Sequence, residues 1–208
     1  MSDGYAVYSS LARGAPEITP VHCWAHVRRK FLEAESSFPE ESRKAIDWIG
    51  ELYEVERGVP TLSRGAPEDV RAEALALRTR LREERSRPIV DDLRGWAYET
   101  KPATLPQSLL GKAIDYMLSL WPGLTVFLTD PRVPLDNNAA ERALRGVVVG
   151  RKNHYGSHSR RGAEVAAVMY TLFESAKLAG VDPHRYVLEA TRRAIASPGT
   201  ATLPENVT

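Results

Sequence analysis

The sequence predicts an α/β protein that tends towards mostly α. Apolar residues recur at helical spacing through residues 40–122, and helix signals resume at Asp136. Strand candidates are few: the turn-like start at residues 2–5 and the apolar, β-branched stretch Ile18–Trp24. Because a strand ladder needs neighbouring strands, so few candidates predict an incomplete sheet.

The composition is that of an ordinary soluble protein. The chain has 208 residues, 43% of them hydrophobic and 26% charged, and its net charge is +1. A near-neutral protein has no overall field that attracts DNA, so any nucleic-acid binding must come from a local patch. A single cysteine excludes an internal disulfide and suits the cytoplasm. No apolar stretch approaches the roughly 18 residues of a membrane span, so we expect no membrane partner.

The first elements are short. Residues 2–5 suit a strand end or turn, residues 5–12 a helix, and Ile18–Trp24 a buried strand, with a helix over Val27–Glu35. The following block, 40–122, reads as all helical. Three groups of residues carry its apolar spacing: Ala45, Ile49 and Leu52; Val70, Ala74, Leu77 and Leu81; and Leu110, Ala113, Ile114, Met117 and Trp121. The arginines between Arg78 and Arg87 alternate with glutamates, which predicts solvated helix faces.

The last third of the chain predicts three helices. The first begins near Asp136, after a proline-rich loop. An amphipathic helix over Val165–Lys177 should end at Gly180, a good C-terminal cap. Asp182 and Pro183 fit an N-cap followed by proline at the first helical position. Residues 197–208 have no periodicity and predict a loose tail.

The stretch Asp136–Arg145 is the first candidate for chemistry, and two interpretations stay open. Asn138 could cap the helix while Glu141 reaches back to it, or Asp136 could cap instead. Alternatively, Glu141 projects a carboxylate towards a metal ion. Arg142 and Arg145 could neutralise Glu141 or hold a phosphate beside it.

A second candidate is the stretch Cys23–Lys30, in which His26 follows Cys23 by three residues. A structural zinc site needs about four ligands, and the chain has no second cysteine, so a buried cysteine and a hydrogen-bonded histidine are the better interpretation. Arg28 and Arg29 could form a solvated face or contact DNA phosphates. Asp3, which precedes a glycine, reads locally as a turn residue.

The segment 142–161 is the best basic patch in the chain. It holds six lysines or arginines and no acidic residue: Arg142, Arg145, Arg151, Lys152, Arg160 and Arg161. Such patches bind phosphate, although one of this size also fits an ordinary exposed surface.

Taken together, these stretches resemble transposases of the insertion-sequence-66 family, which belong to the DDE superfamily. The matching blocks are Ser-Asp-Gly-Tyr (2–5), His-Cys-Trp-Ala-His-Val-Arg-Arg-Lys-Phe (22–31), Asp-Asn-Asn-Ala-Ala-Glu-Arg-Ala-Leu-Arg (136–145) and Gly-Arg-Lys-Asn (150–153). The resemblance implies a ribonuclease-H-like core, here partial, with a large helical insertion. It divides the chain into a partial core (1–35), the insertion (36–130), C-terminal core helices with the Glu motif (131–196) and the tail (197–208).

The resemblance also implies roles for individual residues. Asp3 and Glu141 match the second and third carboxylates of a metal-dependent DNA-cutting site. In a complete site, two Mg²⁺ or Mn²⁺ ions would activate the nucleophile and stabilise the leaving group. Cys23, Trp24, His26, Asp136, Asn137 and Asn138 match structural supports, and Arg142, Arg145, Arg151, Lys152, Arg28 and Arg29 are the expected DNA contacts.

The expected function is therefore DNA transposition, as the C-terminal part of a transposase that cleaves and joins DNA strands. Because no residue matches the first Asp, we expect this chain alone to be inactive. DNA is the expected partner, with other transposase subunits or an upstream fragment. The alternative is a truncated, non-catalytic remnant that binds DNA or a full-length transposase. A purely helical interaction module is a third reading.

Overall fold

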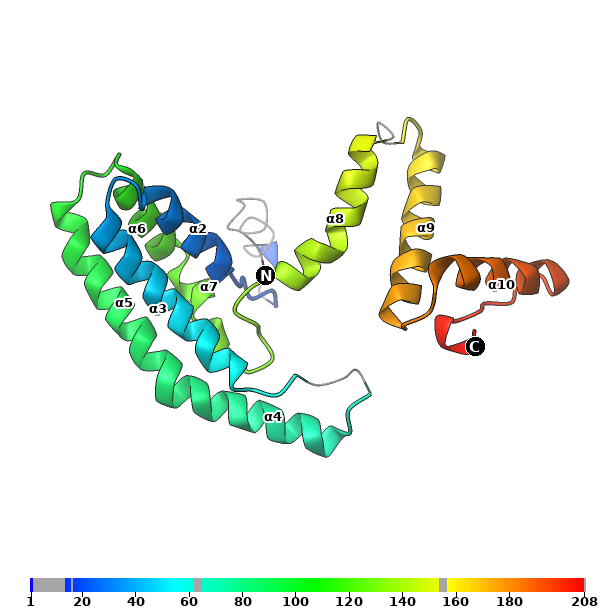
Figure 1. Ribbon diagram of the computed structural model, residues 1–208, viewed down its shortest axis with the longest axis horizontal. Coiled ribbons are helices and arrows are strands. Elements are labelled where there is room, and N and C mark those ends of the chain that lie inside the picture. The colour runs from blue at the N-terminus through cyan, green and yellow to red at the C-terminus, as the bar shows by residue number, and fades with distance from the viewer. Residues whose placement is uncertain (2–13, 16, 62–64, 154–156, 208) are drawn as a thin grey trace. The chain divides into compact units, whose positions relative to one another are not determined.

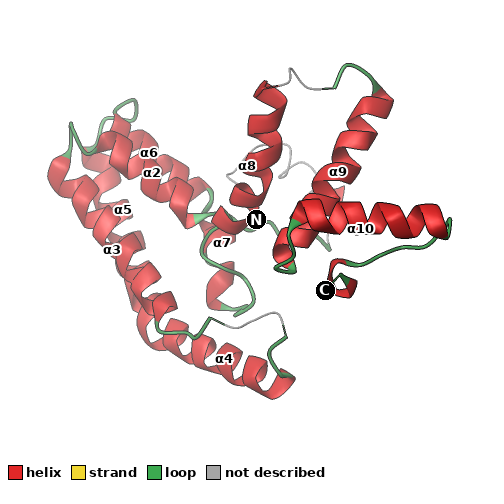
Figure 2. Cartoon of the chain, turned by 45° about the vertical axis from the view of Figure 1, so that its right-hand side comes forward, coloured by secondary structure: helices red, strands yellow, loops and turns green. Residues whose placement is uncertain are grey.

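A computed structural model describes residues 1, 14–15, 17–61, 65–153 and 157–207, in which helices and loops make up the chain (Figures 1 and 2). The α-helices are α2 (Trp24–Ala34), α3 (Pro39–Arg57), α4 (Glu68–Leu81), α5 (Arg87–Thr100), α6 (Leu109–Ser119), α7 (Trp121–Leu124), α8 (Asn138–Asn153), α9 (Arg160–Leu178) and α10 (Pro183–Ala196). A π-helical turn, η1 (Arg82–Ser86), lies between α4 and α5, and 3₁₀ turns are η2 (Lys101–Ala103), η3 (Val126–Leu128) and η4 (Pro204–Asn206). None of these helices is long and apolar enough to cross a membrane.

The chain divides into two compact units, Met1–Asn138 and Ala139–Thr208. In the first unit, α2 packs against α3 and α6. Its buried side chains, Trp24, Val27, Phe31 and Ala34, recur at the three- and four-residue spacing of one helix face. The three apolar groups that predict helix between residues 40 and 122 fall in α3, in α4, and in α6 with α7, which confirms those helices.

Aromatic rings fill the middle of this bundle. The indole of Trp24 meets the rings of Trp121 and Phe127 edge to face, with centroids 6.1 and 6.4 Å apart. Phe31 lies against Trp96, whose ring also contacts Trp48. The core thus joins α2 to α3, α5 and the segment after α6.

The expected partial ribonuclease-H-like core is not present in the described part of the chain, which contains no sheet; this prediction of the fold class was wrong. Residues 18–24 do not form a buried strand, since Glu17–Pro20 are exposed and Trp24 already begins α2. The backbone N–H of His22 donates to the carbonyl of Gly123 at 3.1 Å, and that of Trp24 donates to Leu135 at 3.0 Å.

Distant backbone partners explain this difference. A β-branched stretch has strand propensity but forms a strand only beside another one, and here the carbonyls of Gly123 and Leu135 accept from His22 and Trp24 instead. Gly123 makes the approach possible, because a Cβ at this position would collide with the His22 ring and crowd the Pro20 carbonyl. The apolar face of α2 consequently packs on helices rather than on a sheet.

In the second unit, α9 and α10 pack against each other. Gly180 adopts a φ of 73°, its N–H donates to Lys177, and the N–H of Val181 donates to Ala176. This is a Schellman cap, so the predicted end of this helix at Gly180 is confirmed. The Asp182 carboxylate accepts from the N–H of Arg185 at 2.8 Å with Pro183 at the first helical position, which confirms the predicted start.

The C-terminal residues return to α9 and α10, although their lack of periodicity predicts a loose tail. The hydroxyl of Tyr186 donates to the carbonyl of Thr202 at 2.8 Å. Val207 is buried in a small cluster with Ala176 and Tyr186. Leu203 and Val207 are the two large apolar residues of this polar segment, and two such residues are too weak a pattern to predict this packing.

The Phe31→Ala variant should destabilise the first unit by about 3–5 kcal/mol, because it removes a fully buried ring and leaves a cavity against Trp96. All four tryptophans lie in this unit, so tryptophan fluorescence during urea unfolding measures its stability selectively. Leu32→Ala, at the next and exposed position, should cost less than about 1 kcal/mol. Equal destabilisation by the two variants would contradict the described orientation of α2.

Candidate functional site

The start of α8 is held by Asp136. One carboxylate oxygen accepts from the backbone N–H of Asn138 at 3.0 Å, and the other accepts from its side-chain amide at 2.8 Å. Asn138 is the first residue of α8, so it lies inside the helix and not at the N-cap position that a capping box needs, and its side-chain amide donates to Asp136. Of the two capping alternatives, the structure therefore supports Asp136 as the cap.

The two blocks that carry the family resemblance meet in space. The backbone N–H of Trp24 donates to Leu135, immediately before Asp136, and the indole N–H of Trp24 donates to Leu124 at 2.9 Å. Cys23 is buried beside this junction and His26 is half-buried. Residues about 100 positions apart in the sequence thus fix one point, the connection that leads into α8.

Tyr53, on α3, belongs to the same junction. Its burial, and next the nearby Asp136 carboxylate, raise the pKa of the phenol, so Tyr53 stays protonated through the neutral range. The carboxylate therefore faces a neutral polar group from α3 and the N–H groups of its own helix start. The helical periodicity of residues 45–56 signals that Tyr53 lies beside the core, but not that it lies near Asp136.

Glu141 lies in the first turn of α8 and is exposed to solvent. Arg142, Arg145 and Arg151 on the same helix are also exposed, and the backbone of Lys152 continues it. With 3.6 residues per turn, Arg145 lies one turn after Glu141 on nearly the same side of α8. On α2, Arg29 is exposed and Arg28 is half-buried.

Of the two expected metal ligands, the structure describes one, Glu141. Asp3 lies outside the described residues, so its distance from Glu141 stays a prediction. Among the residues that the structure describes, no three His, Cys, Asp or Glu side chains lie close enough to hold one metal ion. One exposed carboxylate does not build a two-ion site, so the fit to two divalent ions depends on further ligands such as Asp3.

Arg82 is a residue whose place the sequence patterns do not predict, because its alternation with glutamates indicates a solvated helix face. In the structure, Arg82 is fully buried and forms an ion pair with Glu56, with Nε and Oε1 2.6 Å apart. A signal for this burial exists in the sequence. Arg82 lies four residues before Ser86 and eight before Val90, so it continues the apolar face of α5 towards its N-terminus.

Comparison with known proteins gives the family. The model of the "Transposase IS66 family" matches residues 1–165, most of the chain, and the chain therefore belongs to this family. The resemblance found from the sequence blocks is confirmed.

Three uncharacterized proteins of Sinorhizobium fredii are among the relatives. Protein y4hP is 36% identical over 215 residues, covering 96% of this chain and 37% of y4hP. Protein y4jD is 32% identical over 204 residues, covering 95% of this chain and 38% of y4jD. Protein y4qI is 33% identical over 199 residues, covering 92% and 35%. The chain thus spans just over a third of the length of these relatives. No solved structure matches it.

The Asp136→Ala variant should weaken the start of α8, because the N–H of Asn138 would have no acceptor. We expect a cost of about 1 kcal/mol, measured as faster amide hydrogen exchange over residues 138–142. Asp136→Asn keeps a carbonyl oxygen and should recover most of the protection. Unchanged exchange in Asp136→Ala would show that another group caps α8.

Proposed function

We propose that this chain acts in DNA transposition, as part of a protein that cleaves and joins DNA strands. Its membership of the transposase family supports this proposal, and the exposed surface of α8 carries it. Within one motif, Asp136 holds the helix start, whereas Glu141 and Arg145 are presented to solvent one turn apart. That spacing suits a carboxylate at a reacting phosphate with a guanidinium that holds the neighbouring phosphate.

Divalent ions, which this family generally uses, would supply charge stabilisation at the reacting phosphate. In this proposal Glu141 supplies one carboxylate ligand and Asp3 a second. The arginines of α8 bind and orient the DNA backbone. The alternative function is non-catalytic: the same exposed basic residues could hold DNA without cutting it, or assist a full-length transposase.

The basic segment 142–161 should bind DNA without sequence preference. In Arg151→Glu/Lys152→Glu, affinity should fall to a similar extent for unrelated duplexes. The dependence of log K on log salt should become less steep by about one for each phosphate that the variant no longer neutralises. Fluorescence anisotropy with labelled duplexes at several salt concentrations measures both quantities.

The matched control is Arg43→Glu/Lys44→Glu, which reverses two adjacent, exposed charges on α3 and changes the net charge equally. This control should bind DNA as the unmodified chain does. An equal fall in affinity in both variants would mean that net charge, and not the basic segment, determines binding.

Nicking and strand-transfer assays with Mg²⁺ or Mn²⁺ distinguish the two functions. We expect cleavage when the chain is combined with the remainder of a full-length relative, and we expect Glu141→Gln and Asp3→Asn each to abolish it. Glu164→Gln, an exposed carboxylate on α9, is the control and should leave cleavage unchanged. DNA binding without cleavage in any combination would support the non-catalytic alternative. Cleavage that persists in Glu141→Gln would exclude the proposed role of this residue.

A further inference from the structure

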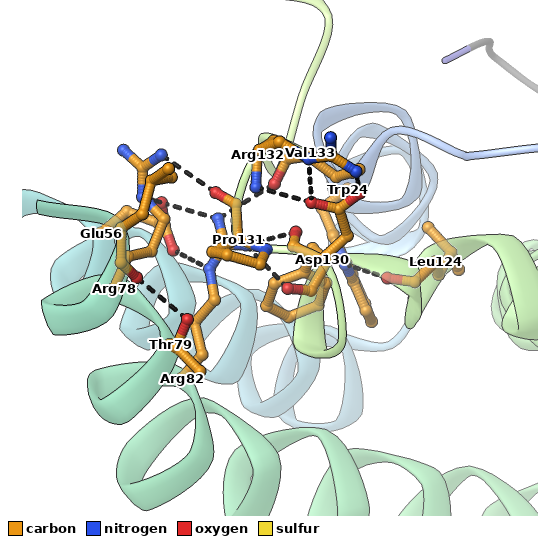
Figure 3. Close-up of polar contacts among 12 residues, drawn as sticks. Trp24, Glu56, Arg78, Thr79, Arg82, Leu124, Asp130, Pro131, Arg132 and Val133 are labelled. Atoms are coloured by element: carbon orange, nitrogen blue, oxygen red, sulfur yellow. Dashed lines mark hydrogen bonds and ion pairs between the residues drawn. The ribbon is translucent and has the colours of Figure 1, made fainter. Parts of the chain in front are cut away.

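A buried arginine ties the loop before α8 to the long helix formed by α4, η1 and α5. Figure 3 shows the Arg82 side chain between Glu56 and the turn that contains Asp130 and Val133. Its Nε and one Nη donate to the two carboxylate oxygens of Glu56, at 2.6 and 3.0 Å. The remaining N–H groups donate to the carbonyls of Phe127, Asp130 and Val133, at 2.7, 3.2 and 3.0 Å.

These five hydrogen bonds match the full number of N–H donors of the guanidinium. Arginine has five N–H donors in a planar fork, and five acceptors surround it here. Its cation also lies over the Phe127 ring, 5.1 Å from the centroid. Lysine, with three donors on a single nitrogen, cannot reach acceptors spread over this plane.

The helix that carries Arg82 is distorted at this residue. Arg82 opens the π-turn Arg82–Ser86, and the N–H of Arg87 donates to the carbonyl of Arg82, five residues back. A π-turn is rare within an α-helix and is frequent at functional sites. The turn places Arg82 and Ser86 inside the bundle, whereas Glu83, Glu84 and Arg85 remain exposed.

The three carbonyls belong to the segment that leads directly into the Glu motif. Val133 lies two residues before Leu135, which accepts from Trp24, and three before Asp136, which caps α8. Arg78 adds a further bond, from its Nη1 to the carbonyl of Pro131 at 3.2 Å. Two arginines of one long helix therefore hold residues 127–133, the segment that precedes α8.

We propose that Arg82 is a positioning residue for Asp136, which caps α8 at the start of the Glu motif. It acts by fixing residues 127–136, so that Asp136 and the start of α8 lie at a defined point of the first unit. The proposal rests on the proposed function of Glu141, but the fixing of the turn can be measured without any DNA cleavage.

Hydrogen exchange of the 208-residue chain tests the positioning. In Arg82→Met, protection of the amides of residues 127–140 should fall by about 100-fold, because three carbonyls of the turn lose their donor and Glu56 keeps only the longer pair with Arg78, at 3.3 Å. Amides of α2 and α6 should keep most of their protection. The control is Arg87→Met, one turn further along, whose exposed pair with Glu83 should matter little.

Two further variants keep the test decisive if Arg82→Met does not fold. Arg82→Lys retains the charge and the aliphatic stem, and protection of residues 127–140 should still fall. In Arg82→Ala, millimolar guanidinium chloride should restore protection of this segment, whereas urea, which is planar and uncharged, should not. Native protection in Arg82→Lys, or a decrease spread evenly over α2 and α6, would overturn the proposal.

Hydrogen exchange and cleavage together distinguish the positioning role of Arg82 from the proposed role of Glu141 in cleavage. Reduced protection in Arg82→Lys, with no DNA cleavage by any form of the protein, would leave the positioning role standing and reject the function of Glu141. Cleavage that depends on Glu141 but keeps its full rate in Arg82→Lys would reject the positioning role alone. If both hold, Arg82→Lys should lower the cleavage rate at saturating DNA and leave DNA affinity unchanged.

Discussion

A buried guanidinium sets a strict condition on the first unit. Removing Arg82 from water costs several kcal/mol unless its donors are satisfied, so the folded state must bring five acceptors to one plane. Glu56 supplies two of them from α3, and three carbonyls come from residues 127–133. Alternative packings of the same helices that displace either partner leave a buried charge unpaired. The Arg82–Glu56 pair therefore specifies one arrangement of α3, η1 and the turn, although hydrophobic burial in the bundle supplies most of the stability.

The π-turn carries the buried guanidinium. Arg82 and Ser86, at its two ends, are buried and lie at four-residue spacing with Val90. Beyond the turn, α5 buries Val90 and Leu93, whereas α4 buries no residue fully. The irregular turn therefore lies at the junction between a more exposed and a more buried half of one long helix.

The sequence predicts the features that depend on neighbouring residues, and it does not predict those that depend on residues far away in the chain. Helical periodicity finds the buried positions of α3 and α6, such as Ile49, Leu52 and Ile114, because neighbours three or four residues away determine them. The caps at Gly180 and Asp182 are equally local. Local propensity assigns Ile18–Trp24 to a strand, but the partners of this stretch are carbonyls about 100 residues away. Charge alternation wrongly assigns Arg82 to a solvated face. The acceptors that bury it lie 26 to 51 residues away in the sequence, outside any local pattern.

The short motif that begins at Asp136 likewise has two parts, one that contacts the fold and one that is exposed. Asp136 and Leu135 are engaged by the first unit through α8 capping and the Trp24 N–H, so substitutions there act on the fold. From Ala139 onward, α8 belongs to the other unit, and Glu141, Arg142 and Arg145 are exposed. The motif therefore divides at Asn138. Its first positions make the hydrogen bonds that hold the helix start in the first unit, and its exposed charged side chains follow in the second.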